Sequence, residues 1–370
     1  MMLPAREVLA LHRAVTAIPS VSGDEVALAG FLEAKLRQYG ASPVRVGNSL
    51  LAFAGHGPML LLDTHIDTVP PAPGWTRDPW NVGNVEDVEE GDGRIYGLGS
   101  NDAKAAVVGM LAAFLAFRNV DLPFTLALAL VEGEETRGIG TGAVLEELAR
   151  RGVRPAAAVV GEPTELDVAV AQKGLMVLEL VAKGEACHAA HAAALGAPNA
   201  ARRLAHDIVA LEAVDFGPPH ARLGPITLEP TRVQAGTARN VVPGEATAIL
   251  DVRTTPALPR TEVVRRIESV VGDGSEVRIL SDRLLPREIE ESSPLVKAAL
   301  RVRPEARLYG SPTLSDMALL DGIPAIKCGP GRSERSHTPD EYVLASEVVD
   351  GALFYTRLVG AYAEGLAEER

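Results

Sequence analysis

The chain is poor in cysteine, in aromatic residues and in positive charge. It has two cysteines in 370 residues, Cys187 and Cys328, so no disulfide framework is expected and a cytoplasmic location is favoured. Aromatic residues make up only 4%, which predicts a core built mainly of alanine, leucine and valine. The net charge of −13 argues against nucleic acid or an anionic membrane surface as a partner.

Long apolar runs are also missing. No segment approaches the roughly 20 uninterrupted apolar residues of a membrane span, and the first residues lack the basic and apolar stretches of a signal peptide. There is no internal repeat and no low-complexity tract. With 370 residues, 47% of them hydrophobic, the chain is long enough for two domains with separate cores.

Up to Lys173, predicted strands alternate with predicted helices, which indicates a largely parallel sheet covered on both faces. A capping box between Ser22 and Glu25 is expected to begin one helix, which Gly40 ends. The stretch 70–96 is predicted to be a long functional loop. The predicted helices are 4–17, 22–39, 103–118 and 139–151, and the predicted strands are 43–54, 58–64, 123–131 and 156–161.

After Lys173 the order becomes strand, helix, strand, strand, helix, strand, which is typical of a ferredoxin-like unit. Its predicted elements are 175–182, 198–213, 225–235, 246–253, 261–271 and 275–281. Helix and strand alternate again at 293–302, 308–309, 314–321, 323–327 and from 345. The sequence therefore predicts an α/β domain formed by 1–173 and 284–370, with a small α+β domain inserted at 174–283.

Several apolar runs stop abruptly on acidic residues or histidine. Pro58–Asp63 leads to His65 and Asp67, and Phe124–Val131 leads to Glu134 and Glu135. In the same way Ala156–Val160 leads to Glu162, and Ile323–Lys327 precedes His337. Buried strands that end on polar residues indicate a site at the carboxyl edge of a sheet, where ligands bind in open α/β sheets.

These side chains suit a pair of metal ions that share a carboxylate. His65 and Glu162 suit one ion, Glu135 and His337 suit the other, and Asp102 could bridge them. Asp67, two residues from His65, could fix the tautomer of that imidazole, and Glu134 is left over as a general base. The pattern alone is about equally compatible with a solvated polar rim, in which Asp102 only caps its helix.

Five segments together resemble a known family. The segments 60–70, 97–105, 131–135, 160–164 and 329–343 look like those of the dinuclear zinc amidohydrolases and peptidases, which include acetylornithine deacetylase, succinyl-diaminopimelate desuccinylase, aminoacylase and the glutamate carboxypeptidases. The resemblance spans the chain in order. It departs at Ala105, where the family often has glycine, and at Leu98, where arginine is usual; neither is a predicted ligand.

The resemblance implies a zinc-peptidase-like catalytic domain with an inserted ferredoxin-like lid that commonly mediates dimerisation. It implies two divalent metal ions, with zinc as the expected metal and cobalt as an alternative, and a general base. In that scheme one ion is held by His65, Asp102 and Glu162, the other by Asp102, Glu135 and His337, with Glu134 as general base and acid and Asp67 as the residue that orients His65.

The resemblance also implies roles for lid residues. His188 matches a histidine that commonly reaches the active site of a dimer mate and stabilises the oxyanion; packing at the dimer interface is the alternative. Asn240 and Arg253 match lid motifs that help bind substrate, and Arg253 could grip an α-carboxylate unless it only pairs with Asp251. Gly331, in the C-terminal motif, is a third candidate for substrate binding.

The expected substrate is a small N-acylated amino acid. The motifs around Asp316 and His337 look most like the arginine- and lysine-biosynthesis branch, so an acetylornithine or acetylcitrulline deacetylase ranks first. A hydrolase that releases lysine or ornithine from an acidic amino-group carrier protein, a succinyl-diaminopimelate desuccinylase and a dipeptidase are alternatives. The positive charges of Arg332 and Arg335 would suit an acidic carrier protein, but the net charge of −13 does not favour binding to one. A non-catalytic metal-dependent binding protein is disfavoured because all predicted ligands and Glu134 are present.

Overall fold

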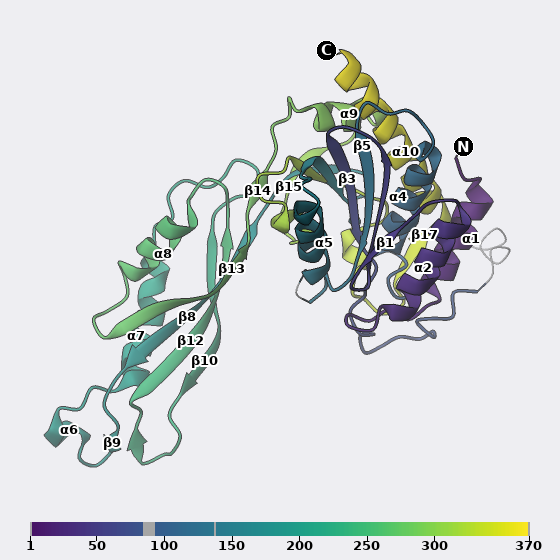
Figure 1. The fold of residues 1–370 in the computed structure, drawn as a ribbon. Coiled ribbons are helices and arrows are strands. Elements are labelled where there is room, and N and C mark those ends of the chain that lie inside the picture. Colours follow the sequence, from purple (N-terminus) through teal and green to yellow (C-terminus); the bar gives the residue numbers. More distant parts are fainter. Residues whose placement is uncertain (1, 84–92, 137, 369–370) are drawn as a thin grey trace. The chain divides into compact units, whose positions relative to one another are not determined.

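The computed structural model describes residues 2–83, 93–136 and 138–368 (Figure 1). By its internal contacts the chain divides into two compact units. The first comprises Met1–Val170, Glu288–Tyr309 and Ser315–Arg370, and the second comprises Ala171–Arg287 and Gly310–Leu314. Among the described residues, no helix has both the length and the apolar character needed to cross a membrane.

The larger sheet has nine strands in the order β1-β2-β5-β3-β6-β16-β7-β14, with β15 beside β7. Its centre is parallel, because β3 pairs in parallel with β5 and β6, and β6 with β16. The flanking pairs β1–β2, β2–β5 and β16–β7 are antiparallel. The sheet is therefore mixed rather than largely parallel. The strands are Val44–Val46 (β1), Ser49–Gly55 (β2), Met59–His65 (β3), Thr125–Val131 (β5), Pro155–Val160 (β6), Val168–Gln172 (β7), Arg287–Glu288 (β14), Leu308–Ser311 (β15) and Ala325–Lys327 (β16).

Helices cover both faces of the central strands (Figure 1). Successive side chains of a strand point to opposite faces, so Leu60 and Leu62 of β3 pack with one set of helices and Leu61 with the other. The first set is α1 (Ala5–Thr16), α2 (Val26–Gln38), α4 (Lys104–Phe117), α9 (Pro294–Val302) and α10 (Ala345–Glu368); the second face carries α5 (Ile139–Arg150). Helix α4 is buried on nearly every side, which explains its almost continuous apolar sequence.

Local details differ from the predictions. The predicted strand 43–54 is a hairpin, because Gly47 takes a positive φ of 64° between β1 and β2. The capping box is wrong: the Ser22 hydroxyl donates to Asp67 instead, and α2 begins at Val26 without a side-chain cap. The predicted helix 314–321 is only a 3-10 turn, η2 (Asp316–Leu319). Gly40 has the expected positive φ, 81°.

The second unit is built on a four-stranded antiparallel sheet in the order β10-β12-β8-β13. Two helices, α7 (Ala200–Ala210) and α8 (Arg260–Glu268), bury Leu204 and Ile267 against it. The strands are Gly174–Lys183 (β8), Thr227–Ala235 (β10), Glu245–Thr254 (β12) and Ser275–Leu284 (β13). The chain order β-α-β-β-α-β and the spatial order are those of a ferredoxin-like unit, as the sequence predicted.

Smaller elements complete the description. In the first unit β4 (Arg94–Tyr96) pairs with β17 (Tyr342–Leu344), and η3 spans Ser333–Arg335. The second unit adds β9 (Cys187–His188), which pairs with β11 (Val241–Val242), together with α6 (Ala192–Leu195) and η1 (Leu211–Ala213). Within the predicted loop 70–96, residues 84–92 lie outside the described part of the chain, and β4 forms its end.

A buried histidine makes the stability of this fold depend on pH. His12 of α1 is fully buried and hydrogen-bonds through Nε2 to the Ser100 carbonyl at 2.8 Å. Burial outweighs that bond, and with the charges of Lys104 and Arg13 it lowers the pKa of His12 to about 4. In the unfolded chain the imidazole takes up a proton near its ordinary pKa of about 6.5. Unfolding therefore consumes a proton between these values, and stability falls as the pH drops through this window.

We expect His12→Gln, which keeps a donor for the Ser100 carbonyl but does not titrate, to reduce this dependence. Between pH 7 and 5 the free energy of unfolding of the wild type should fall by about 2 kcal/mol more than that of the variant. Equilibrium urea unfolding in the presence of a chelator measures the difference. Parallel pH profiles of the two proteins would show that His12 does not titrate as described.

Candidate metal-binding active site

The central strands bring the predicted ligands to one edge of the sheet. His65 ends β3, Glu134 and Glu135 follow β5, and Glu162 follows β6. Strands β5 and β6 both pair in parallel with β3, with His65 opposite Val131 and Asp63 opposite Val160. The carboxyl ends of all three strands therefore meet, as expected for a site in an open α/β sheet.

Asp102 lies between two groups of donor atoms. His65, Asp102 and Glu162 form one group and Asp102, Glu135 and His337 the other, and within each group one ligand atom per residue lies within 4.8 Å of the others. The Asp102 Oδ1 atom is 3.2 Å from His65 Nε2, whereas Oδ2 is 3.8 Å from His337 Nε2. The His337 ring also lies 2.8 Å from Glu135 Oε1. Each oxygen of one carboxylate thus faces a different imidazole.

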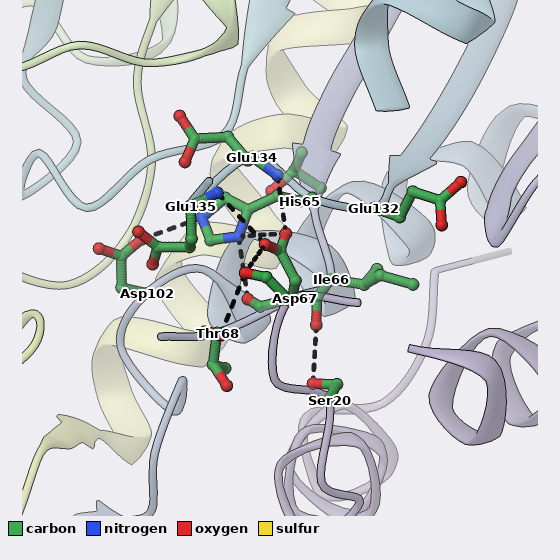
Figure 2. A network of polar contacts seen from close by, with 12 residues as sticks. Ser20, His65, Ile66, Asp67, Thr68, Asp102, Glu132, Glu134 and Glu135 are labelled. Carbon is green, nitrogen blue, oxygen red and sulfur yellow. Dashed lines mark hydrogen bonds and ion pairs between the residues drawn. The ribbon is translucent and has the colours of Figure 1, made fainter. Parts of the chain in front are cut away.

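Asp67 holds the His65 ring and the Glu134–Glu135 turn together (Figure 2). His65 Nδ1 is 3.1 Å from the carbonyl oxygen of Asp67 and 3.5 Å from its Oδ1. The carboxylate also accepts the backbone N–H groups of Glu134 and Glu135, at 3.1 and 3.2 Å, and the Ser22 hydroxyl at 2.6 Å. The spacing of two residues in the sequence indicated that Asp67 contacts the His65 ring. The sequence did not indicate the bonds of Asp67 to Ser22, Glu134 and Glu135, which join distant segments.

The site concentrates negative charge away from water. Burial and then the charge of Asp102 raise the pKa of Glu162 to about 8. Burial raises the pKa of Glu134 as well, and Glu162 and Asp316 add to it. For His65, burial opposes the charged form, but the hydrogen bonds to Asp102 and Asp67 outweigh it and raise its pKa well above the usual value. Positive charge placed among these carboxylates would stabilise their ionised forms.

Divalent cations fit this donor set. Imidazole nitrogens and carboxylate oxygens are ligands that zinc and its neighbours accept, and two groups that share one carboxylate match a two-ion site. Glu134 belongs to neither group. Its backbone N–H is held by Asp67, and its carboxylate lies close enough to Glu162 and His65 for their charges to act on its pKa.

Two further acidic features escaped the sequence analysis. Glu341 is 1% exposed, and its Oε1 accepts the backbone N–H groups of Asn101 and Asp102 at 2.9 and 3.1 Å, which holds the loop that carries Asp102. Asp63 and Asp316 are buried on either side of the Thr141 hydroxyl, at 3.0 and 2.8 Å. For Glu341 the spacing of four residues from His337 was the available signal, because its backbone partners leave no pattern in a sequence.

The predicted substrate-binding residues occupy different environments. His188, on β9, is exposed and accepts the N–H of Ala190 through Nδ1, and the carbonyl of Asn240 accepts the N–H of Ala189. Arg253, on β12, makes a two-pronged ion pair with Asp251 at 2.7 and 3.0 Å, the alternative that the sequence left open. These residues belong to the second unit, whereas Gly331 is buried in the first.

The chain resembles known proteins over most of its length. The family model "Peptidase family M20/M25/M40" matches residues 61–361. The chain is 29% identical over 377 residues to a peptidase M20 domain-containing protein of Schizosaccharomyces pombe, which covers 97% of this chain and 86% of the relative. It is 30% identical over 283 residues to the succinyl-diaminopimelate desuccinylase of Bordetella pertussis, which covers 73% of each.

A solved structure supports the fold. That of a tripeptidase from Staphylococcus aureus superimposes with a TM-score of 0.77 at 20% identity and covers 98% of this chain and 100% of that chain. The matched residues include every member of both donor groups and Glu134. The chain therefore belongs to the peptidase family M20/M25/M40 and is a metal-dependent hydrolase of the metallopeptidase and amidohydrolase type.

Proposed function

We propose that the enzyme hydrolyses the amide bond of a small N-acylated amino acid at a pair of divalent metal ions. The observation that carries the proposal is the position of Asp102, whose two carboxylate oxygens face the rings of His65 and His337 separately. A single-ion site would not need the second group. Two ions about 3.5–4 Å apart are typical of hydrolases that share a bridging carboxylate.

The ligand roles follow from the two donor groups. One ion would be held by His65, Asp102 and Glu162 and the other by Asp102, Glu135 and His337. We infer zinc as the first choice from the mixture of imidazole and carboxylate, with cobalt as an alternative. When bound, such ions polarise the amide carbonyl and supply hydroxide at neutral pH.

The protein supplies the proton transfer and the alignment. Glu134 is free of both donor groups and is anchored through its backbone to Asp67, so its carboxylate can take the proton from the attacking water and return it to the leaving amine. Asp67 also fixes the His65 ring that it contacts through Nδ1, which leaves Nε2 for the metal. Asp67 therefore aligns a ligand, mainly through its backbone carbonyl, and the base through its carboxylate.

The substrate class is inferred from relatives and from sequence motifs. The likeness to a desuccinylase that acts on an acylated amino acid favours that class over longer peptides. Within the class we rank an acetylornithine or acetylcitrulline deacetylase of arginine biosynthesis first, from the motifs around Asp316 and His337. Succinyl-diaminopimelate, a dipeptide and a lysine- or ornithine-loaded carrier protein are the alternatives, and the relatives named as desuccinylase, carboxypeptidase and tripeptidase fit these as well.

The second unit would act as a lid and dimerisation domain. We propose, from the family resemblance, that His188 stabilises the oxyanion in a partner's site and that Asn240, Arg253 and Gly331 contribute to substrate binding. Arg253 would then exchange its pair with Asp251 for the substrate carboxylate, because both carboxylates accept two hydrogen bonds from the guanidinium group. The two free cysteines and the acidic charge favour a cytoplasmic enzyme.

Metal binding by single variants tests the ligand roles. The wild type should bind about two ions per chain, His65→Ala and His337→Ala about one each, and Asp102→Ala fewer than either because it serves both groups. Equilibrium dialysis against zinc followed by elemental analysis measures the stoichiometry. His56→Ala is the matched control, since this histidine is 81% exposed and lies outside both groups. Two tightly bound ions in Asp102→Ala would contradict the bridging role.

A substrate panel tests the reaction. Zinc- or cobalt-loaded enzyme should release the free amine from at least one of acetylornithine, acetylcitrulline and succinyl-diaminopimelate, with a Gly-X dipeptide assayed in parallel. Glu134→Ala should keep its metal but lose about 10²–10⁴-fold in kcat, because the proton transfer is lost while the ligands remain. No turnover of any acylated amino acid by the metal-loaded wild type would refute the proposal.

Mixed dimers test where His188 acts. If His188 serves the partner's site, dimers that combine Glu134→Ala with His188→Ala contain one complete site. Coexpression of the two inactive chains should then restore about a quarter of the wild-type activity, since half of random dimers are mixed and each has one working site. Sedimentation establishes the dimer independently. Activity no higher than that of the single variants would place His188 outside the partner's site.

A further inference from the structure

The segment 329–341, here called the C-terminal loop, meets the loop that follows Glu162. The backbone N–H groups of Thr164 and Leu166 donate to the carbonyl of Gly329 at 3.1 and 3.0 Å, and that of Glu165 donates to the carbonyl of Gly331 at 2.7 Å. These backbone bonds hold the start of the C-terminal loop beside one ligand. Glu341 holds the other end of the loop on the backbone of Asn101 and Asp102. His337 lies between these two ends, so its position also depends on what holds residues 332–336.

Asn101 provides that attachment through its side chain. Its Nδ2 donates to the carbonyl of Arg332 at 2.9 Å and to the Ser336 hydroxyl at 3.2 Å, and its Oδ1 accepts the backbone N–H of Arg332 at 2.9 Å. Asn101 is 1% exposed, so these bonds form where no water competes. Both N–H donors and the oxygen acceptor of the carboxamide thus form hydrogen bonds with the loop that carries His337.

The contact reaches the bridging carboxylate as well. The Ser336 hydroxyl, which accepts from Asn101, is hydrogen-bonded to the carboxylate of Asp102. Gly331 makes room for the carboxamide: its φ is +87°, and a Cβ there would lie 2.3 Å from Asn101 Oδ1. Packing against Asn101 therefore explains why residue 331, which the sequence suggested for substrate binding, is a glycine.

Asn101 is not needed to shape its own loop. Glu341 already holds the backbone of Asn101 and Asp102, and Lys104 of α4 is buried nearby with its ammonium 3.3 Å from the carbonyl of Ile18. The carboxamide adds contacts only to the C-terminal loop. Its removal should therefore loosen the docking of one loop on the other without unfolding either.

We propose that Asn101 is a positioning residue that docks the middle of the His337 loop against the loop of Asp102, so that the second metal group binds its ion tightly only while this contact is intact. The inference rests on the two-metal site of the proposed function. It predicts different effects on the two ions. The group of His65, Asp102 and Glu162 contains no residue of the C-terminal loop, whereas the other group depends on His337.

The test compares metal binding by Asn101→Ala with that by the wild type, using calorimetric titration of the metal-free protein with zinc. The first ion should bind with unchanged affinity and the second about 10–100-fold more weakly, as for other groups that orient ligands. Ser336→Ala, which keeps the Asn101 bonds to Arg332 but loses the link to Asp102, should weaken the second ion less.

Arg332→Ala is the matched control. It removes the exposed side chain and its 3.2 Å ion pair with Glu165 but keeps the backbone N–H and carbonyl that Asn101 contacts. It should bind both ions like the wild type. A purely structural role for Asn101 would instead weaken both ions together and lower thermal stability to match, which overturns the inference.

Other outcomes are equally decisive. A second ion bound by folded Asn101→Ala within about twofold of the wild type would overturn the inference and leave the two-metal site standing. A wild type that binds fewer than two ions would overturn both. If Asn101→Ala does not fold, Asn101→Ser, which keeps a small polar side chain but is too short to make the bonds to Arg332, decides: selective weakening of the second ion supports the docking role, and wild-type binding overturns it.

Discussion

The structure of the site depends on carboxylates that are gathered around Asp102 with too little positive charge among them. Removing a carboxylate from water is costly unless a cation or hydrogen-bond donors compensate. Here the raised pKa values of Glu134 and Glu162 reflect that cost. Divalent ions between the two imidazoles would satisfy the same oxygens, so the arrangement makes chemical sense as a metal site and little sense as a solvated rim.

The rest of the first unit serves to bring these groups together. Three parallel strands deliver His65, the Glu134–Glu135 turn and Glu162 to one edge. Loops outside these strands complete the site, and buried polar side chains hold them by contacting backbone atoms of other loops. Asp67, Asn101 and Glu341 all act in this way. Their hydrogen bonds lie in the protein interior, away from water. Leaving a buried donor or acceptor unpaired there costs free energy, so the geometry of these bonds is well defined.

Membership of the family and the geometry of the ligands define the type of reaction, whereas the substrate is chosen by other residues. The ligands would be the same for a deacetylase, a desuccinylase or a dipeptidase, because all cleave an amide bond. Discrimination requires contacts with the acyl group and the amino acid. Arg253, which we propose for such a contact, is paired with Asp251 in this structure, so in that role it would have to leave this pair to bind substrate.

The sequence by itself determined the family, the α/β class and the ferredoxin-like insertion, because strand periodicity and short motifs are local properties. It also named the residues that the structure brings together in the two groups, whose role as metal ligands stays a prediction. It did not determine that the sheet is mixed, that Ser22 bonds to Asp67 rather than capping α2, or that Gly331 packs on Asn101. Those facts were decided by the tertiary structure. They involve residues tens to hundreds of positions apart, or backbone atoms that every residue shares, and such partners leave no periodic signal in the chain.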